Sequence, residues 1–176
     1  MTRRSILPVR LPVARLVPGV PNPRFLDAMA HLPAGVVVVS ARVGDEFRGL
    51  TASSFVSISV EPPLVAVALE HLSVTRAAVL ETKAFNVSVL TRPQEFIADR
   101  FAGRAPAIDP LWRTLPHRLG LNGIPLLEGC AAWLECRLLE AHAAGDHDLC
   151  LAEVEDATLG SGDPLILWDR AFWTLH

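Results

Sequence analysis

The chain of 176 residues is 51% hydrophobic and 20% charged, a composition that supports one buried core and a single domain and argues against a disordered chain. Its 16 basic and 19 acidic residues leave a net charge of −3, so we expect no general attraction to nucleic acid or to a membrane surface. Charges or prolines interrupt every apolar run before it reaches the length of a membrane span. Three cysteines without a C-x-x-C pair fit reduced core thiols, and we expect a cytoplasmic protein.

The first residues differ in composition from the rest of the chain. Residues 1–22 combine arginines with closely spaced prolines and hold no acidic residue, which favours an extended, polyproline-like chain. They lack the unbroken apolar stretch and small-residue cleavage site of a secretory signal. We therefore predict a proline- and arginine-rich N-terminal arm over residues 1–22 and one folded domain over residues 23–176.

Hydrophobic patterns along the domain predict mainly strands. The β-branched run 36–43 turns at Gly44-Asp45 and returns through 47–51, which is typical of a hairpin. Apolar or alternating stretches predict further strands over 64–69, 85–90, 130–141, 149–159 and 165–175. Capping residues and apolar spacing predict helices over 22–32, 73–81 and 91–101.

The order of these elements favours a mainly β fold with flanking helices. About six or seven strands occur without the strand–helix alternation of a parallel sheet, so we expect a closed antiparallel barrel. The stretch 105–127, rich in proline and glycine, is predicted to be an irregular connection of the kind that often covers a site. Cys130 and Cys136 are predicted to lie on the same face of one strand.

Hydroxyl side chains concentrate after the predicted hairpin, in the run Gly49-Leu50-Thr51-Ala52-Ser53-Ser54-Phe55. Short hydroxyls and accessible backbone amides suit a ligand rich in carbonyl and phosphate oxygens. Downstream, Ser73 is a predicted N-cap with Thr75 and Arg76 in the first helical turn, where a helix attracts phosphate. A solvated turn and an ordinary helix cap are the simpler explanations. Together the two features favour a phosphorylated ligand.

Several short motifs also follow one another in the order and spacing of a known family. They are Arg24-Phe25-Leu26, Pro33-Ala34-Gly35-Val36, the hydroxyl run, Glu61-Pro62-Pro63-Leu64-Val65, Phe85-Asn86-Val87-Ser88-Val89-Leu90, Arg100-Phe101-Ala102-Gly103, Ile124-Pro125-Leu126-Leu127 and Gly145-Asp146-His147. Through them the chain resembles, over residues 24–175, the flavin reductase family, the small NAD(P)H:flavin oxidoreductase components of two-component flavin monooxygenases. The resemblance implies that residues 23–176 form an antiparallel Greek-key FMN-binding split β-barrel.

The resemblance also implies which residues bind the flavin. Thr51, Ala52, Ser53 and Ser54 would line the isoalloxazine and ribityl-phosphate region, and the backbone of Ala68, Leu69 and Glu70 would lie beside it. Ser73 and Thr75 would bind the phosphate. Relatives commonly carry Arg or Lys where this chain has Val74, so either Arg76 or an arm residue supplies the charge, or FMN binds more loosely.

The implied activity is hydride transfer from NADH or NADPH to FMN or FAD, with reduced flavin passing to a partner oxygenase. Gly145, Asp146 and His147 would lie where the nicotinamide approaches, with His147 as the catalytic residue. The simpler explanation for His147 is a solvated turn. Since no Rossmann glycine motif is present, we expect the nicotinamide to bind over the flavin, against Trp112, Trp173 or the 105–127 connection.

Other functions remain open at this point. A non-catalytic flavin-binding module, which stores or senses the cofactor, is the main alternative, and a purely structural dimerisation barrel is a third. The family resemblance implies a homodimer, and we expect neither nucleic-acid nor membrane partners. Acidic and histidine side chains around His147 match no zinc spacing, so no metal site is predicted. Trp133 and Trp168 are predicted to pack in the core.

Overall fold

The computed structural model describes residues 22–104 and 111–174, so the predicted arm lies outside the described residues except for Asn22. The helices are α1 (Asn22–Ala30), α2 (Val74–Thr82) and α3 (Glu95–Phe101), with the 3-10 helices η1 (Arg92–Gln94) and η2 (Leu111–Thr114). The strands are β1 (Ala34–Gly35), β2 (Val37–Val43), β3 (Glu46–Ala52), β4 (Val56–Ser59), β5 (Leu64–Glu70), β6 (Ala84–Val89), β7 (His117–Leu119), β8 (Pro125–Leu127), β9 (Ala132–Ala144), β10 (His147–Leu159), β11 (Leu165–Trp168) and β12 (Ala171–Thr174). Within these two ranges, every helix is too short or too polar to cross a membrane.

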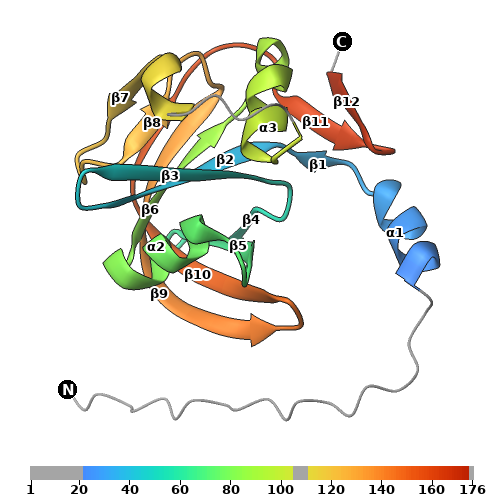
Figure 1. Cartoon of the computed structure of the whole chain (residues 1–176), viewed down its shortest axis with the longest axis horizontal. Coiled ribbons are helices and arrows are strands. Elements are labelled where there is room, and N and C mark those ends of the chain that lie inside the picture. The colour runs from blue at the N-terminus through green and yellow to red at the C-terminus, as the bar shows by residue number, and fades with distance from the viewer. Residues whose placement is uncertain (1–21, 105–110, 175–176) are drawn as a thin grey trace.

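Seven strands form one antiparallel sheet in the order β3-β2-β6-β9-β10-β5-β4. The sheet curls upon itself, so that β3 at one edge comes close to β5 near the other (Figure 1). Just after β3, the Ser54 hydroxyl donates to the Ala68 carbonyl at 3.0 Å and accepts from the Ala68 N–H at 3.2 Å. The two edge strands do not pair with each other in the described residues, so the barrel is split along this seam.

Strand β2 lies at the centre of the core because both of its faces are buried. Val37 and Val39 pack in a cluster enclosed by the curled sheet. Val36, just before β2, and Val38 pack on the opposite side, in a cluster that includes residues of α3. A strand buried on both faces needs apolar residues at consecutive positions, which explains the unbroken valine run.

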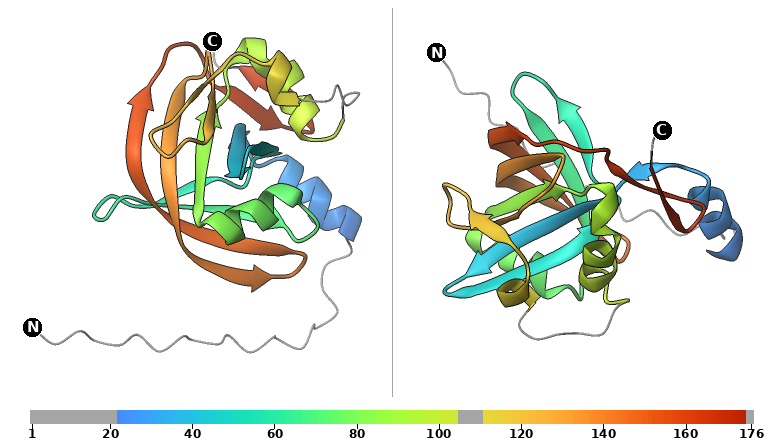
Figure 2. Two further views of the ribbon diagram at one scale, coloured as in Figure 1. Left: turned by 60° about the vertical axis from the view of Figure 1, so that its left-hand side comes forward. Right: turned by 90° about the horizontal axis from the view of Figure 1, so that it is seen from above.

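Helix α2 sits within the curve of the sheet (Figures 1 and 2). Its Ala78 and Val79 are buried in the enclosed cluster. Ser73 caps its N-terminus, and Lys83 ends it in the left-handed region at φ 59°. Helix α1, in contrast, has no buried residue and lies beside β1 and the β11–β12 hairpin (Figure 1). Its contacts to that hairpin include the Asp27–Arg170 ion pair.

Four predictions from the pattern are wrong. The stretch 165–175 forms two strands, because the chain reverses at Asp169 and Arg170, both at positive φ. The 105–127 connection contains η2 and the β7–β8 ladder, although its residues 105–110 lie outside the described part. Short strands of this kind raise the number to twelve in the described residues. Cys130 precedes β9 and packs in a different cluster from Cys136.

Candidate active site

A cavity of about 560 Å³ opens where β3, β5 and the first turn of α2 meet. Its walls come from five places in the chain: the end of β3 with the residues after it, β5, the start of α2, the end of α3 and the start of β10. The lining residues are Gly49, Leu50, Thr51, Ala52, Ser53, Ser54, Ala68, Glu70, Leu72, Ser73, Val74, Thr75, Phe101, Ala102, Gly103 and His147. Both hydroxyl-rich segments singled out in the sequence therefore face one hollow.

The wall formed by the hydroxyl run is fixed to its neighbours. Thr51 Oγ1 donates to the Ala98 carbonyl of α3 at 2.7 Å, and Ser54 bridges to Ala68. At Gly49 an added Cβ would lie 2.5 Å from a ring carbon of Phe101, so only glycine lets β3 approach α3 this closely. This approach brings Phe101 and the residues after it to the cavity.

The first turn of α2 forms the opposite wall. Ser73 Oγ accepts hydrogen bonds from the backbone N–H groups of Thr75 at 3.2 Å and Arg76 at 3.3 Å. The Thr75 hydroxyl is buried against the cavity and has no hydrogen-bond partner in the described residues. A buried hydroxyl normally has a partner, so this one marks a point where a ligand oxygen can bind.

His147 enters the cavity from the first position of β10. Its Nδ1 lies 2.7 Å from Asp146 Oδ1, and its side chain is 40% exposed. The hydrogen bond from His147 lowers the pKa of the Asp146 carboxyl, so this carboxylate is ionised at neutral pH. Gly145, at φ 68°, forms the turn between β9 and β10.

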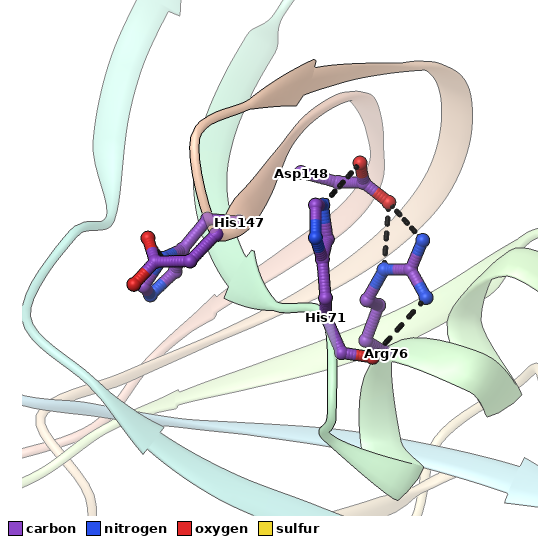
Figure 3. A network of polar contacts seen from close by, with 5 residues as sticks. His71, Arg76, His147 and Asp148 are labelled. Carbon is purple, nitrogen blue, oxygen red and sulfur yellow. Dashed lines mark hydrogen bonds and ion pairs between the residues drawn. The ribbon is translucent and has the colours of Figure 1, made fainter.

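A second polar cluster lies directly behind this hairpin, on the other face of β10 (Figure 3). Asp148 Oδ1 lies 3.2 Å from His71 Nε2, and Asp148 Oδ2 accepts from Arg76 Nε at 2.6 Å. Burial alone would raise the pKa of Asp148, but the hydrogen bonds and charges of Arg76 and His71 outweigh it and hold that pKa below its usual value. The cluster therefore ties the start of α2 to the strand that carries His147.

Most of the residues expected to bind the flavin line the cavity: Thr51, Ala52, Ser53, Ser54, Ala68, Glu70, Ser73 and Thr75, together with His147. Leu69, Arg76, Gly145 and Asp146 do not line it. The Leu69 side chain is fully buried in the core, and the Arg76 guanidinium is paired with Asp148. Gly145 and Asp146 precede β10 in the hairpin turn.

Sequence reasoning missed His71, Asp148 and the segment from Phe101, the last residue of α3, to Gly103. A predicted helix gives no signal of which strand its end will touch, although the glycine at position 49 inside a strand does indicate close approach. The tryptophan predictions were partly wrong. Trp112 is buried beside Phe101, whereas Trp168 is 40% exposed and packs edge-to-face against Trp173.

Comparisons of the sequence with known proteins all match the same family. The sequence profile of the flavin reductase like domain matches residues 29–176. A Thermus thermophilus protein named 4-hydroxyphenylacetate 3-monooxygenase, reductase component, is 37% identical over 153 residues, covering 84% of this chain and 93% of that protein. An Agrobacterium fabrum protein named FMN reductase (NADH) SmoA is 36% identical over 158 residues, covering 89% of this chain and 88% of that protein.

The fold agrees with these matches. The solved structure of the Streptomyces globisporus NADH:FAD oxidoreductase SgcE6, in complex with NAD and FAD fragments, superposes with a TM-score of 0.80 at 33% identity. The superposition covers 87% of this chain and 92% of that one. The curled seven-stranded sheet is thus the split barrel that the sequence motifs implied, and the chain belongs to the flavin reductase-like family.

Proposed function

We propose that this protein is an NAD(P)H-dependent flavin reductase, which transfers a hydride from a nicotinamide to FMN or FAD and supplies the reduced flavin to a partner monooxygenase. The observation that carries the proposal is the single cavity onto which the hydroxyl run, the first turn of α2 and His147 converge. The names of the two sequence relatives support NADH as the reductant and an oxygenase as the partner.

The residues around the cavity fit a flavin. Its volume of about 560 Å³ lies in the range of small-molecule sites. Ala52 and Ala68 are small and leave room for a flat ring beside the strand ends. The Thr75 hydroxyl and the N-terminus of α2 suit oxygens of the ribityl chain or phosphate.

A bound flavin supplies the hydride acceptor, and the protein's task is to hold the two rings in line and exclude water. Because the Asp146 carboxylate is ionised, it accepts a hydrogen bond from His147 Nδ1–H. This bond leaves His147 Nε2 for a ligand and fixes the plane of the ring. We assign His147 the role of orienting the nicotinamide.

The proposal includes a homodimer. Phe25, Leu26, Met29 and Leu32 of α1 and the residues after it are between 44% and 60% exposed. Leu26, Met29 and Leu32 border a hollow of about 680 Å³ that extends to Ser53 and Ser54, next to the cavity. A continuous apolar surface of this kind is typical of a subunit contact. Light scattering on the purified protein tests the dimer, and the Leu26→Glu variant should be monomeric.

The decisive test of the function is oxidation of NADH and NADPH by the purified protein, with and without added FMN or FAD. Turnover that rises with added flavin is the expected result, and the preferred pair identifies both substrates. Flavin binding without turnover would favour the non-catalytic flavin-binding module. Absence of flavin binding would contradict both functions.

Substitution of Thr75 by valine tests the site itself. The change removes a buried hydroxyl that has no partner in the described residues, so the free energy of unfolding should stay constant or increase slightly. Flavin affinity should fall about five- to tenfold if that hydroxyl binds a flavin oxygen. Thr82→Val is the control, because the Thr82 hydroxyl donates to the Ala78 carbonyl away from the cavity. Equal flavin affinity in both variants would contradict the assigned role of Thr75.

A further inference from the structure

The cavity contains almost no charge, and its one fixed charge is negative. Among its lining residues within the described ranges there is no lysine or arginine, and Glu70 is the acidic one. His147 is hydrogen-bonded to the carboxylate of Asp146. The two residues flanking Ser73, Leu72 and Val74, are apolar and are 89% and 66% exposed at the cavity rim. A phosphate placed at the start of α2 would therefore meet mainly the Ser73 and Thr75 hydroxyls, because Ser73 Oγ already accepts from the Thr75 and Arg76 N–H groups.

The nearest cation on α2 is held away from this point. Arg76 follows Thr75 directly, but its Nε and Nη2 lie 2.6 and 2.5 Å from Asp148 Oδ2. Its Nη1 donates to the His71 carbonyl at 3.4 Å. In Figure 3 the Arg76–Asp148 pair lies on the opposite side of His71 from His147. Three contacts thus fix the guanidinium behind the cavity wall.

Strand geometry explains the separation. Consecutive residues of a β-strand point to opposite faces, so His147 turns toward the cavity and Asp148 turns away from it. Asp148 is 6% exposed and its pKa is lowered, so it is an ionised partner for Arg76 over the whole neutral range. Moving Arg76 to the cavity would leave this buried carboxylate with His71 alone.

We infer, on the basis of the proposed function, that the described residues recognise the flavin through its ring and ribityl chain and offer no cationic side chain to the phosphate. Riboflavin and FMN are then substrates of similar affinity, and Asp148 is a specificity-determining residue because it keeps Arg76 from the phosphate. Weak discrimination of this kind suits a flavin that must leave the enzyme after reduction.

The contribution of the phosphate to flavin affinity distinguishes a site without a phosphate-binding cation from a site in which an arginine binds the phosphate. A helix N-terminus alone favours a bound anion by about two- to fivefold. A guanidinium hydrogen-bonded to the phosphate would favour FMN over riboflavin by more than about tenfold. The quantity to measure is therefore the ratio of the dissociation constants of riboflavin and FMN. A change that weakens the binding of both flavins equally leaves this ratio unchanged.

The first experiment titrates oxidised riboflavin and oxidised FMN into the full-length protein and follows flavin fluorescence, without any reductant. We expect the two dissociation constants to agree within about fivefold and the FMN value to change little with salt. FMN binding more than about tenfold tighter, with a strong salt dependence, would overturn the inference but leave the reductase function intact. Failure to bind either flavin would overturn the inference and the proposed function together.

Three variants sharpen the test. Val74→Arg introduces a cation at an exposed position of the first turn and should tighten FMN binding about tenfold with riboflavin unchanged, whereas Val74→Gln should leave the ratio as in the wild type. Arg76→Gln should also leave the ratio unchanged. A fall of about tenfold in FMN affinity relative to riboflavin in Arg76→Gln would show that Arg76 binds the phosphate and would refute the inference.

Discussion

Glu135 and Asp148 are both almost completely buried carboxylates, at 5% and 6% exposure, but they have different partners. Glu135 accepts hydrogen bonds from the backbone N–H groups of Leu121 and Asn122, at 3.0 and 3.1 Å. Asp148 is bound by the side chains of His71 and Arg76. The first carboxylate therefore fixes a loop, and the second fixes side chains beside the cavity.

The two buried carboxylates of the same barrel therefore have different roles: one stabilises the fold, and the other also affects the functional site. A carboxylate that accepts from backbone amides takes the place of the backbone carbonyl groups that would accept these hydrogen bonds in a helix or a sheet. Gly120 is required beside it, because a Cβ at this position would lie 2.6 Å from Glu135 Oε2. A carboxylate bound by side chains instead decides where those side chains can reach. We therefore expect substitutions at Glu135 to affect stability alone, and substitutions at Asp148 to affect both stability and the cavity.

The largest effect is expected for Glu135→Ala. The substitution leaves two backbone N–H groups without their acceptor, so the free energy of unfolding should fall by about 2–4 kcal/mol, measured by denaturant titration. The Michaelis constants for flavin and NADH should not change. Glu140→Ala on the same strand is the control, because that side chain is exposed and should alter stability by less than about 0.5 kcal/mol. Altered flavin kinetics in a folded Glu135→Ala protein would remove the distinction between the two carboxylates.

A smaller loss of stability is expected for Asp148→Asn, about 1–3 kcal/mol at neutral pH, because the neutral amide lacks the negative charge that holds the Arg76 guanidinium. In this variant the Michaelis constant for flavin should change as well, since Arg76 is released next to the first turn of α2. Steady-state kinetics and denaturant titration on the same preparation check both statements. Unchanged flavin kinetics would place Asp148 with Glu135 as a purely structural residue.

The stability difference between wild type and Asp148→Asn should depend on pH in one direction. Burial by itself raises the pKa of Asp148, but Arg76 and His71 lower it overall, so the ionised carboxylate is the form that stabilises the fold. This stabilisation is complete above the unfolded-state pKa of about 3.9 and is lost as the pH falls through the lower folded-state value. Denaturant titrations at a series of pH values, from neutral to below about 4, should show that the stability difference between wild type and Asp148→Asn decreases. A difference that grows in acid would mean that the protonated carboxyl is the stabilising form.

The smallest effect is expected for His71→Asn. Its imidazole is 37% exposed and Arg76 remains on Asp148, so the free energy of unfolding should change by about 0.5–1 kcal/mol. His142→Asn, which alters the exposed pair with Glu140, is the control and should have no measurable effect. A loss as large as that of Asp148→Asn would show that His71, and not Arg76, is the main partner of the carboxylate.

Several elements were predictable because their signals are local. The β2–β3 hairpin turns at Gly44, at φ 58°, and the α2 cap at Ser73 forms the hydrogen bonds that its residue type indicates. Thr91 N–H donates to Gln94 Oε1 at 2.9 Å, as the predicted capping box requires. The turn between β11 and β12 was missed because Asp169 and Arg170 adopt positive φ without the glycine that normally indicates it.

By itself, the sequence determined the family, the strand-rich composition and the two hydroxyl-rich segments of the site, because residue types, caps and motif order are properties of neighbouring positions. Only the tertiary structure decided which groups meet: that Phe101 reaches the cavity past Gly49, that the Thr75 hydroxyl has no partner in the described residues, and that Arg76 turns to Asp148. Those contacts join residues far apart in the chain. They depend on the curl of the sheet and on the face of β10 to which each side chain points. Neither can be predicted from a local sequence pattern.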